Sequence, residues 1–117
     1  MDADIKAVHF IGIGGVGMSG IAHVAHDQGL VVTGSDLKES RYTKQLQEYG
    51  ITVHIGQAAE NIPTDPAPDV VVVSTAIMES NPELQEAHRR GIPVWRRAQM
   101  LAALGRGKQT LCVAGTH

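Results

Sequence analysis

At 117 residues the chain has the length of one domain, enough to bury roughly two-thirds of the surface that its unfolded form exposes. Hydrophobic residues make up 43% and aromatic ones only 3%, so the core is expected to consist of Val, Ile, Leu and Ala, as in a sheet covered by helices. Ten basic and twelve acidic residues give a formal charge of −2, and without a basic stripe this argues against a nucleic-acid partner.

The first predicted unit is a strand, a glycine turn and a helix. The apolar, β-rich run 8–13 predicts a buried strand, and glycines crowd positions 12–17. Apolar residues then recur at i, i+3, i+4 and i+7 over 18–25, which predicts a helix that ends before Gly29. This order gives a G-x-G-x-x-G pattern its meaning, because turn glycines let the backbone approach a ligand and the first N–H groups of the helix attract phosphate.

A second apolar run, 30–34, predicts the next strand and leads into Asp36, which lies 19 positions after Gly17. A nucleotide-binding βαβ unit has a carboxylate at this place, where it accepts a hydrogen bond from a ribose hydroxyl. The alternative is a glycine-rich turn with a surface aspartate.

Strands and helices alternate through the rest of the chain. Ser40 and Asn81 are favoured helix N-cap residues, and Pro82 suits a first helical position. Four consecutive valines at 70–73 predict a strand that is buried on both faces. The predicted elements are a helix over 40–49, a strand over 51–55, one helical turn near 58–61, a strand over 69–73, a helix over 81–91, a strand over 92–95, a helix over 96–104 with Met100, Leu101 and Leu104 inward, a hinge over 105–108 and a sixth apolar run over 109–114.

This alternation predicts an α/β fold: a doubly wound parallel sheet, Rossmann-like, of about five strands in the order 3-2-1-4-5 with helices on both faces. The switch point of such a sheet falls between strands one and four. The glycine turn and residues 74–77 should therefore flank the ligand.

Cysteine and histidine usage predicts neither a disulfide nor a metal site. A single cysteine, Cys112, excludes an internal disulfide, fits a reducing cytoplasm and is expected to be a small buried hydrophobe. His23 and His26 are three residues apart on one helix, away from its apolar stripe, and predict a solvated face. No apolar run approaches 18 residues, so a cytoplasmic protein without a membrane partner is expected.

Five segments, in order along nearly the whole chain, resemble the Mur ligase family: GIGGVGMSGIA, GSDLKES, VVVVSTAIMESNPE, RRAQML and VAGTH. The resemblance implies an ATP-dependent, amide-bond-forming ligase of peptidoglycan synthesis, whose N-terminal domain, here residues 1–107, holds the UDP part of UDP-N-acetylmuramic acid. A central domain would bind ATP and Mg²⁺, and a third would bring L-alanine to a muramoyl carboxylate activated as an acyl phosphate. The family's tripeptide-recycling ligase has a less similar glycine turn and is the second choice.

In that family VAGTH opens the phosphate loop of the central domain, which continues Gly-Lys-Thr. Residues 108–117 are therefore expected to start that domain, with Gly115, Thr116 and His117 as a partial ATP phosphate loop. Because the sequence stops before the lysine that would hold the γ-phosphate, we expect this chain to bind the UDP-sugar but neither ATP nor Mg²⁺, and to contain no catalytic residue.

The residues and the resemblance together predict the roles of the site residues. Backbone N–H groups of 14–19 should receive the diphosphate, and Asp36 should accept from the ribose, with Ser35 and Leu37 along that edge. Residues 74–77 should close the other wall, although Ser74 and Thr75 also fit ordinary turn chemistry. The predicted UDP-sugar site is Gly14, Gly15, Val16, Gly17, Met18, Ser19, Ser35, Asp36, Leu37, Gln57, Ser74, Thr75, Ala76, Ile77 and Arg97.

Three of these positions need comment. Arg97 either adds positive charge near the phosphates or, with Arg96, forms a solvated helix start. Gln57 stands where the family commonly has a histidine near the uracil, and the neighbouring His54 could compensate for it. Gln99 stands where the family usually has the glutamate of RRAEML.

Two functions from other classes share the glycine turn. An NAD-dependent oxidoreductase domain would use Asp36 in the same way and disfavour the 2′-phosphate of NADP. A regulatory Rossmann domain would bind a ligand without catalysis, and the fold alone cannot separate these functions. The ordered motifs after Asp36 favour the ligase.

Overall fold

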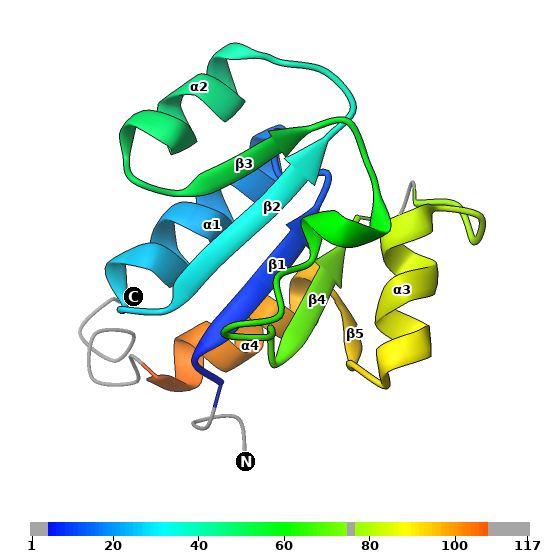
Figure 1. Cartoon of the computed structure of the whole chain (residues 1–117). Coiled ribbons are helices and arrows are strands. Elements are labelled where there is room, and N and C mark those ends of the chain that lie inside the picture. The colour runs from blue at the N-terminus through cyan, green and yellow to red at the C-terminus, as the bar shows by residue number, and fades with distance from the viewer. Residues whose placement is uncertain (1–4, 75–76, 108–117) are drawn as a thin grey trace.

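The computed structural model describes residues 5–74 and 77–107 (Figure 1). Five parallel strands form one sheet in the order β3-β2-β1-β4-β5, so the predicted fold class and strand order are confirmed. The strands are β1 (Ala7–Ile11), β2 (Val31–Asp36), β3 (Thr52–Ile55), β4 (Val70–Val73) and β5 (Val94–Arg96). The helices are α1 (Val16–Asp27), α2 (Arg41–Glu48), the 3-10 turn η2 (Ala59–Asn61), α3 (Pro82–Arg90) and α4 (Arg97–Gly107).

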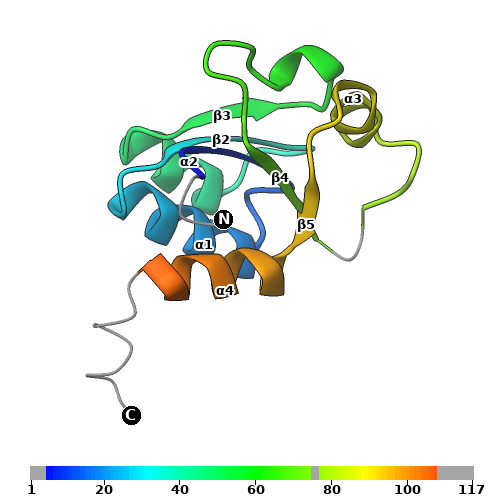
Figure 2. The ribbon, with the colours of Figure 1, turned by 90° about the horizontal axis from the view of Figure 1, so that it is seen from below.

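Helices cover both faces of the sheet because successive strand side chains point to opposite sides. Phe10 and Val72 lie on the face that packs against α1, α2 and α4, where Leu46 and Met100 join the same core. The other face packs Ile11 against α3 and against Ile62, which follows η2. Figure 2 shows α1 and α4 on one side of the sheet and α3 on the other.

The strand register brings the predicted site together at one edge of the sheet. Ile11, the last residue of β1, pairs with Ser35 on one side and with Val73 on the other. The glycine turn therefore leaves the sheet between the ends of β2 and β4, which is the switch point of a doubly wound sheet.

Local signals fix the starts of two helices where the sequence places them. Ser40 Oγ accepts a hydrogen bond from Thr43 N, and Thr43 Oγ1 accepts one from Ser40 N. This reciprocal pair is a capping box for α2. Asn81 accepts from the first N–H groups of α3, and Gly91 ends that helix in the left-handed conformation at φ 73°.

The structure differs from the expected elements in several places. β1 ends at Ile11 rather than at residue 13, and β5 is Val94–Arg96 rather than 92–95. β2 runs two residues further, through Asp36, because β3 pairs with it as far as that residue. α4 continues to Gly107, so residues 105–107 are helical rather than a hinge. Met100 and Leu104 are buried as expected, but Leu101 is 52% exposed, since one residue along a helix turns a side chain by about 100° away from that face.

The structure also bears on a membrane span, on a metal site and on the surroundings of the two histidines of α1. Among residues 5–74 and 77–107, no helix is long and apolar enough to cross a membrane, and no three His, Cys, Asp or Glu side chains gather as a metal site would require. His23 and His26 both contact the ring of Tyr49, with ring centroids 4.5 and 5.3 Å away. The sixth apolar run and Cys112 lie outside the described residues.

Candidate nucleotide-binding site

The glycine turn after β1 is held tightly against the end of β2. Gly12 has φ +84°, a conformation that L side chains rarely adopt, and the N–H groups of Gly12 and Ile13 both donate to the Ser35 carbonyl at 2.9 Å. Gly14 N donates to Asp36 Oδ2 at 2.8 Å. A Cβ on Gly14 would lie 2.7 Å from the same oxygen, so only glycine allows this approach.

Helix α1 starts with backbone donors that the protein leaves open. Gly15 is the N-cap and has no side chain to accept from the helix, and the first turn carries no acidic residue. Within the described part of the chain, the N–H groups of Val16, Gly17 and Met18 have no acceptor. Three aligned donors at the positive end of a 12-residue helix attract an anion.

These open donors are fewer than the sequence predicts for 14–19. Gly14 N is taken by Asp36, Gly15 N by the Gly12 carbonyl, and Ser19 N by the Gly15 carbonyl. The Ser19 side chain is buried and donates back to the Val16 carbonyl. A diphosphate can therefore reach the middle three N–H groups only.

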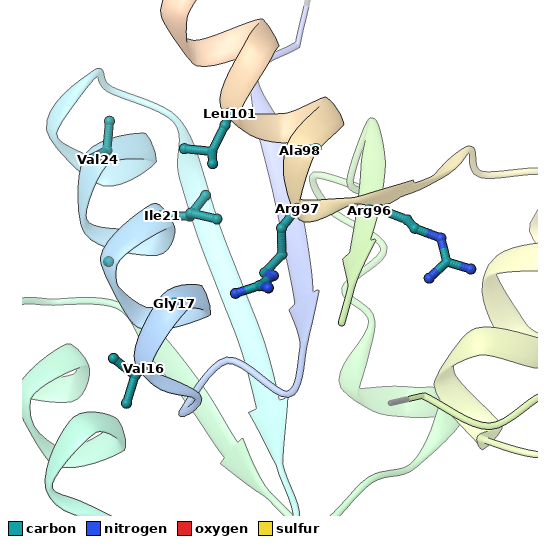
Figure 3. A pocket seen from close by; sticks show the side chains of 9 residues that line it. Val16, Gly17, Ile21, Val24, Arg96, Arg97, Ala98 and Leu101 are labelled. Carbon is teal, nitrogen blue, oxygen red and sulfur yellow. The ribbon is translucent and has the colours of Figure 1, made fainter. Parts of the chain in front are cut away.

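Arg97, the first residue of α4, brings a positive charge to this helix end. Figure 3 shows its side chain reaching toward the first turn of α1, whereas Arg96 points to the other side. The Arg97 guanidinium lies so close to Gly17 that a Cβ on that glycine would collide with it. An apolar groove of 660 Å³ with Ile21, Val24 and Leu101 in its walls begins at this point and runs between α1 and α4.

The end of β2 supplies a carboxylate beside the glycine turn. Asp36 Oδ1 accepts from Leu37 N at 2.8 Å and Oδ2 accepts from Gly14 N. A carboxylate oxygen can accept two hydrogen bonds, so each oxygen retains capacity for a ligand hydroxyl. Leu37 is exposed beside it, but Ser35 is fully buried and faces α3, so its side chain is absent from the edge that it was expected to line.

The opposite wall is described only in part. The Ser74 hydroxyl lies 4.0 Å from where a Cβ on Gly12 would be, so the end of β4 does flank the glycine turn. Ile77 packs against the core under α3. Thr75 and Ala76 lie outside the described residues, as do Gly115, Thr116 and His117.

The loop after β3 places Gln57 at the same edge of the sheet. Gly56 N donates to the Asp36 carbonyl at 2.7 Å, and Gln57 Oε1 accepts from Asn81 Nδ2. Gln99 lies at the start of α4, where its side chain accepts from Arg96 N at 2.8 Å. A glutamine therefore makes the helix-capping contact that a glutamate could make there.

Sequence reasoning missed a buried polar network beneath the site. Glu83 and His9 are fully buried, and Glu83 Oε1 lies 2.7 Å from His9 Nε2 and accepts from Ser35 Oγ at 2.7 Å. Glu83 Oε2 accepts from Ala58 N and Asn61 Nδ2. A histidine inside a buried apolar strand was the available signal, because a buried polar group needs a partner.

Burial alone would raise the pKa of Glu83. The hydrogen bonds from His9, Asn61 and Ser35 outweigh it and hold the pKa of this carboxyl below its usual value. Glu83 is therefore a buried anion that joins β1, β2, α3 and the loop before η2.

Comparison with known proteins shows which proteins this chain is similar to. A UDP-N-acetylmuramate–L-alanine ligase of Paracoccus denitrificans is 53% identical over 117 residues, which are all of this chain and 24% of that protein. The crystal structure of a UDP-N-acetylmuramate-alanine ligase from Thermotoga maritima superposes with a TM-score of 0.77 at 33% identity, over 83% of this chain and 22% of that one. A murein peptide ligase from Psychrobacter arcticus gives 0.75 at 30% identity, over 83% and 20% of the two chains.

The chain thus spans about a quarter of the length of these relatives. The family model described as the catalytic domain of Mur ligases matches residues 7–109, which include the glycine turn, Asp36, Gln57 and Arg97. With that match over most of its length, the chain belongs to the Mur ligase family.

Proposed function

We propose that this chain binds the UDP moiety of UDP-N-acetylmuramic acid and is the substrate-binding domain of a ligase that adds L-alanine to it in peptidoglycan synthesis. The observation that carries the proposal is the open start of α1, where the N–H groups of Val16, Gly17 and Met18 meet the Arg97 guanidinium. Together they suit a diphosphate. Asp36 adds an acceptor for the ribose.

The relatives' printed names support the identity of the sugar nucleotide and of the amino acid. ATP and Mg²⁺ would act in a longer protein, through a central domain that residues 108–117 begin. The predicted phosphate-loop residues lie outside the described residues, and no catalytic step is assigned to the residues that the structure describes. A cytoplasmic location belongs to the same proposal and is supported by the single cysteine.

A thermal-shift series on the 117-residue chain tests the proposal with UDP, UDP-N-acetylmuramic acid, UDP-N-acetylglucosamine, NAD and NADP. A ligand present at about 100 times its dissociation constant adds roughly 2.7 kcal/mol, which raises Tm by several degrees. We expect the uridine compounds to raise Tm and the nicotinamide compounds to leave it unchanged. Stabilisation by NAD alone, or none by any uridine compound, would contradict the proposal.

A further inference from the structure

The first turn of α3 fixes which atom of Gln57 faces which way. Asn81 Oδ1 accepts from Glu83 N at 2.9 Å and from Leu84 N at 3.2 Å, so it is the oxygen of this amide that caps the helix. Asn81 Nδ2 is then the atom that faces Gln57, and a donor there requires the Gln57 oxygen opposite it. The Gln57 amide therefore points its oxygen at Asn81 and its nitrogen elsewhere.

The backbone on both sides of Gln57 is also held. Gly56 N donates to the Asp36 carbonyl, and Ala58 N donates to the buried Glu83 carboxylate at 3.1 Å. With its main chain and its amide oxygen both tied, Gln57 has little freedom to turn its side chain over.

The remaining atom, Gln57 Nε2, is an open donor at the edge of the site. The side chain is half-buried, and among residues 5–74 and 77–107 no acceptor takes a hydrogen bond from Nε2. Gln57 follows Gly56, which pairs with Asp36, so it lies beyond the ribose position on the β3 side. A nucleotide with its diphosphate at α1 and its ribose at Asp36 extends its base in this direction.

We propose that Asn81 is a positioning residue that makes Gln57 a hydrogen-bond donor to the base, and that this polarity selects uracil over cytosine. Uracil presents a carbonyl oxygen at position 4, which accepts from Gln57 Nε2. Cytosine presents an amino group there, which is a second donor and is rejected. The inference rests on the proposed function, because it needs the base of a bound pyrimidine nucleotide to lie beside Gln57.

The test is to turn over the Gln57 side-chain amide by substituting Asn81, while Gln57 itself is left unchanged. In Asn81→Asp the helix cap is kept, because aspartate caps as well as asparagine does. The second carboxylate oxygen accepts instead of donating, so the Gln57 amide turns over, its nitrogen faces α3 and its oxygen faces the base. Asn81→Ser is the matched control, since serine also caps the helix but is too short to reach Gln57.

Calorimetric titration of each 117-residue variant with UDP and with CDP gives the ratio of the two dissociation constants. The wild-type chain is expected to prefer UDP by about tenfold or more. Asn81→Asp is expected to lower that preference at least tenfold, toward CDP, and Asn81→Ser to give an intermediate ratio. The added negative charge weakens the binding of both diphosphates alike and so cancels in the ratio.

Gln57→Glu should move the ratio in the same direction, because a carboxylate opposite Asn81 presents its other oxygen to the base. This second variant decides the matter if Asn81→Asp does not fold. The inference is overturned if the wild-type chain binds UDP and CDP equally well. It is also overturned if the ratio of the two dissociation constants stays within threefold of wild type in both Asn81→Asp and Gln57→Glu. A wild-type chain that binds neither nucleotide contradicts the proposed function instead.

Discussion

At the scale of single residues, Gly17 matters because it has no side chain, and not because it needs an unusual backbone conformation. It is the second residue of α1 and has an ordinary helical backbone, unlike Gly12 with its positive φ. What a side chain there would meet is the Arg97 guanidinium, which is the flexible end of an exposed side chain. The fold can therefore accommodate a larger residue at position 17, but its side chain would fill the space between the open N–H groups of α1 and the Arg97 guanidinium.

Gly17→Val is expected to weaken UDP binding at least tenfold and to leave Tm nearly unchanged. The arginine tip can move aside at little cost, whereas the diphosphate loses its approach to the N–H groups of α1. Gly20→Ala is the control: it lies in the same helix, its Cβ would meet nothing within 4 Å, and alanine should stabilise the helix slightly. Titration calorimetry and thermal denaturation of both variants check this, and normal UDP binding by Gly17→Val would show that the turn is not the phosphate site.

At the scale of elements, α3 acts on the site through one buried carboxylate. Glu83 accepts hydrogen bonds from β2 and from the loop before η2, and it contacts His9 of β1. The Ser35 carbonyl holds the start of the glycine turn from the same strand. Through Glu83, α3 thus holds both the end of β2 and the loop before η2.

Glu83→Ala is expected to destabilise the fold by about 3 kcal/mol or more, because it leaves several buried donors without an acceptor. Glu83→Gln should cost clearly less: its oxygen can accept from Ala58 N and Asn61, while its amide can donate to Ser35 Oγ and His9. Urea denaturation of the three proteins at pH 7 gives these free energies of unfolding. Equal losses in the two variants would show that the charge, and not the acceptor geometry, is what the network requires.

Comparing wild type with Glu83→Gln also shows how much of the pH dependence of stability comes from Glu83. Because the pKa of Glu83 is lower in the folded chain than its usual value, its contribution to stability is full above about pH 4.3 and is lost as the pH falls toward the folded-state pKa. Glu83→Gln removes this part of the acid sensitivity. The difference in unfolding free energy between wild type and Glu83→Gln should therefore shrink below about pH 4.

These elements also show how far sequence reasoning reaches. Ser40, Asn81 and Gly91 carry local chemistry that fixes a helix end wherever the chain goes, and all three were located correctly. Strand order followed from alternation, because parallel strands need crossovers. The Glu83 network could not be predicted in detail, since its partners His9 and Ser35 are 74 and 48 residues away in the sequence. The burial of the Ser35 side chain was not predicted for a different reason: because β2 extends through Asp36, the alternation of side chains along the strand turns Ser35 toward α3.

At the scale of the whole molecule, the two faces of the sheet are built differently. The face under α1, α2 and α4 is an apolar core that includes Phe10 and Met100. The face under α3 combines a smaller apolar cluster with the buried His9 and Glu83 pair. The first face supplies stability by burial, and the second supplies fixed geometry, because a satisfied polar network permits one arrangement. The candidate site lies at the edge of the sheet where both faces end.

The sequence predicts that this domain closes at residue 107, and a shortened chain tests that boundary. α4 contributes Met100 and Leu104 to the core and ends at Gly107. A chain of residues 1–107 is therefore expected to keep its stability within about 1 kcal/mol, which is a Tm change of roughly 5 °C or less, and to keep its affinity for UDP. Leu104→Ala in the 117-residue chain is the reference for the loss of a core side chain, and it is expected to lower the free energy of unfolding by about 2–5 kcal/mol. If removing residues 108–117 costs as much as Leu104→Ala, those residues belong to this domain and not to the one that follows it.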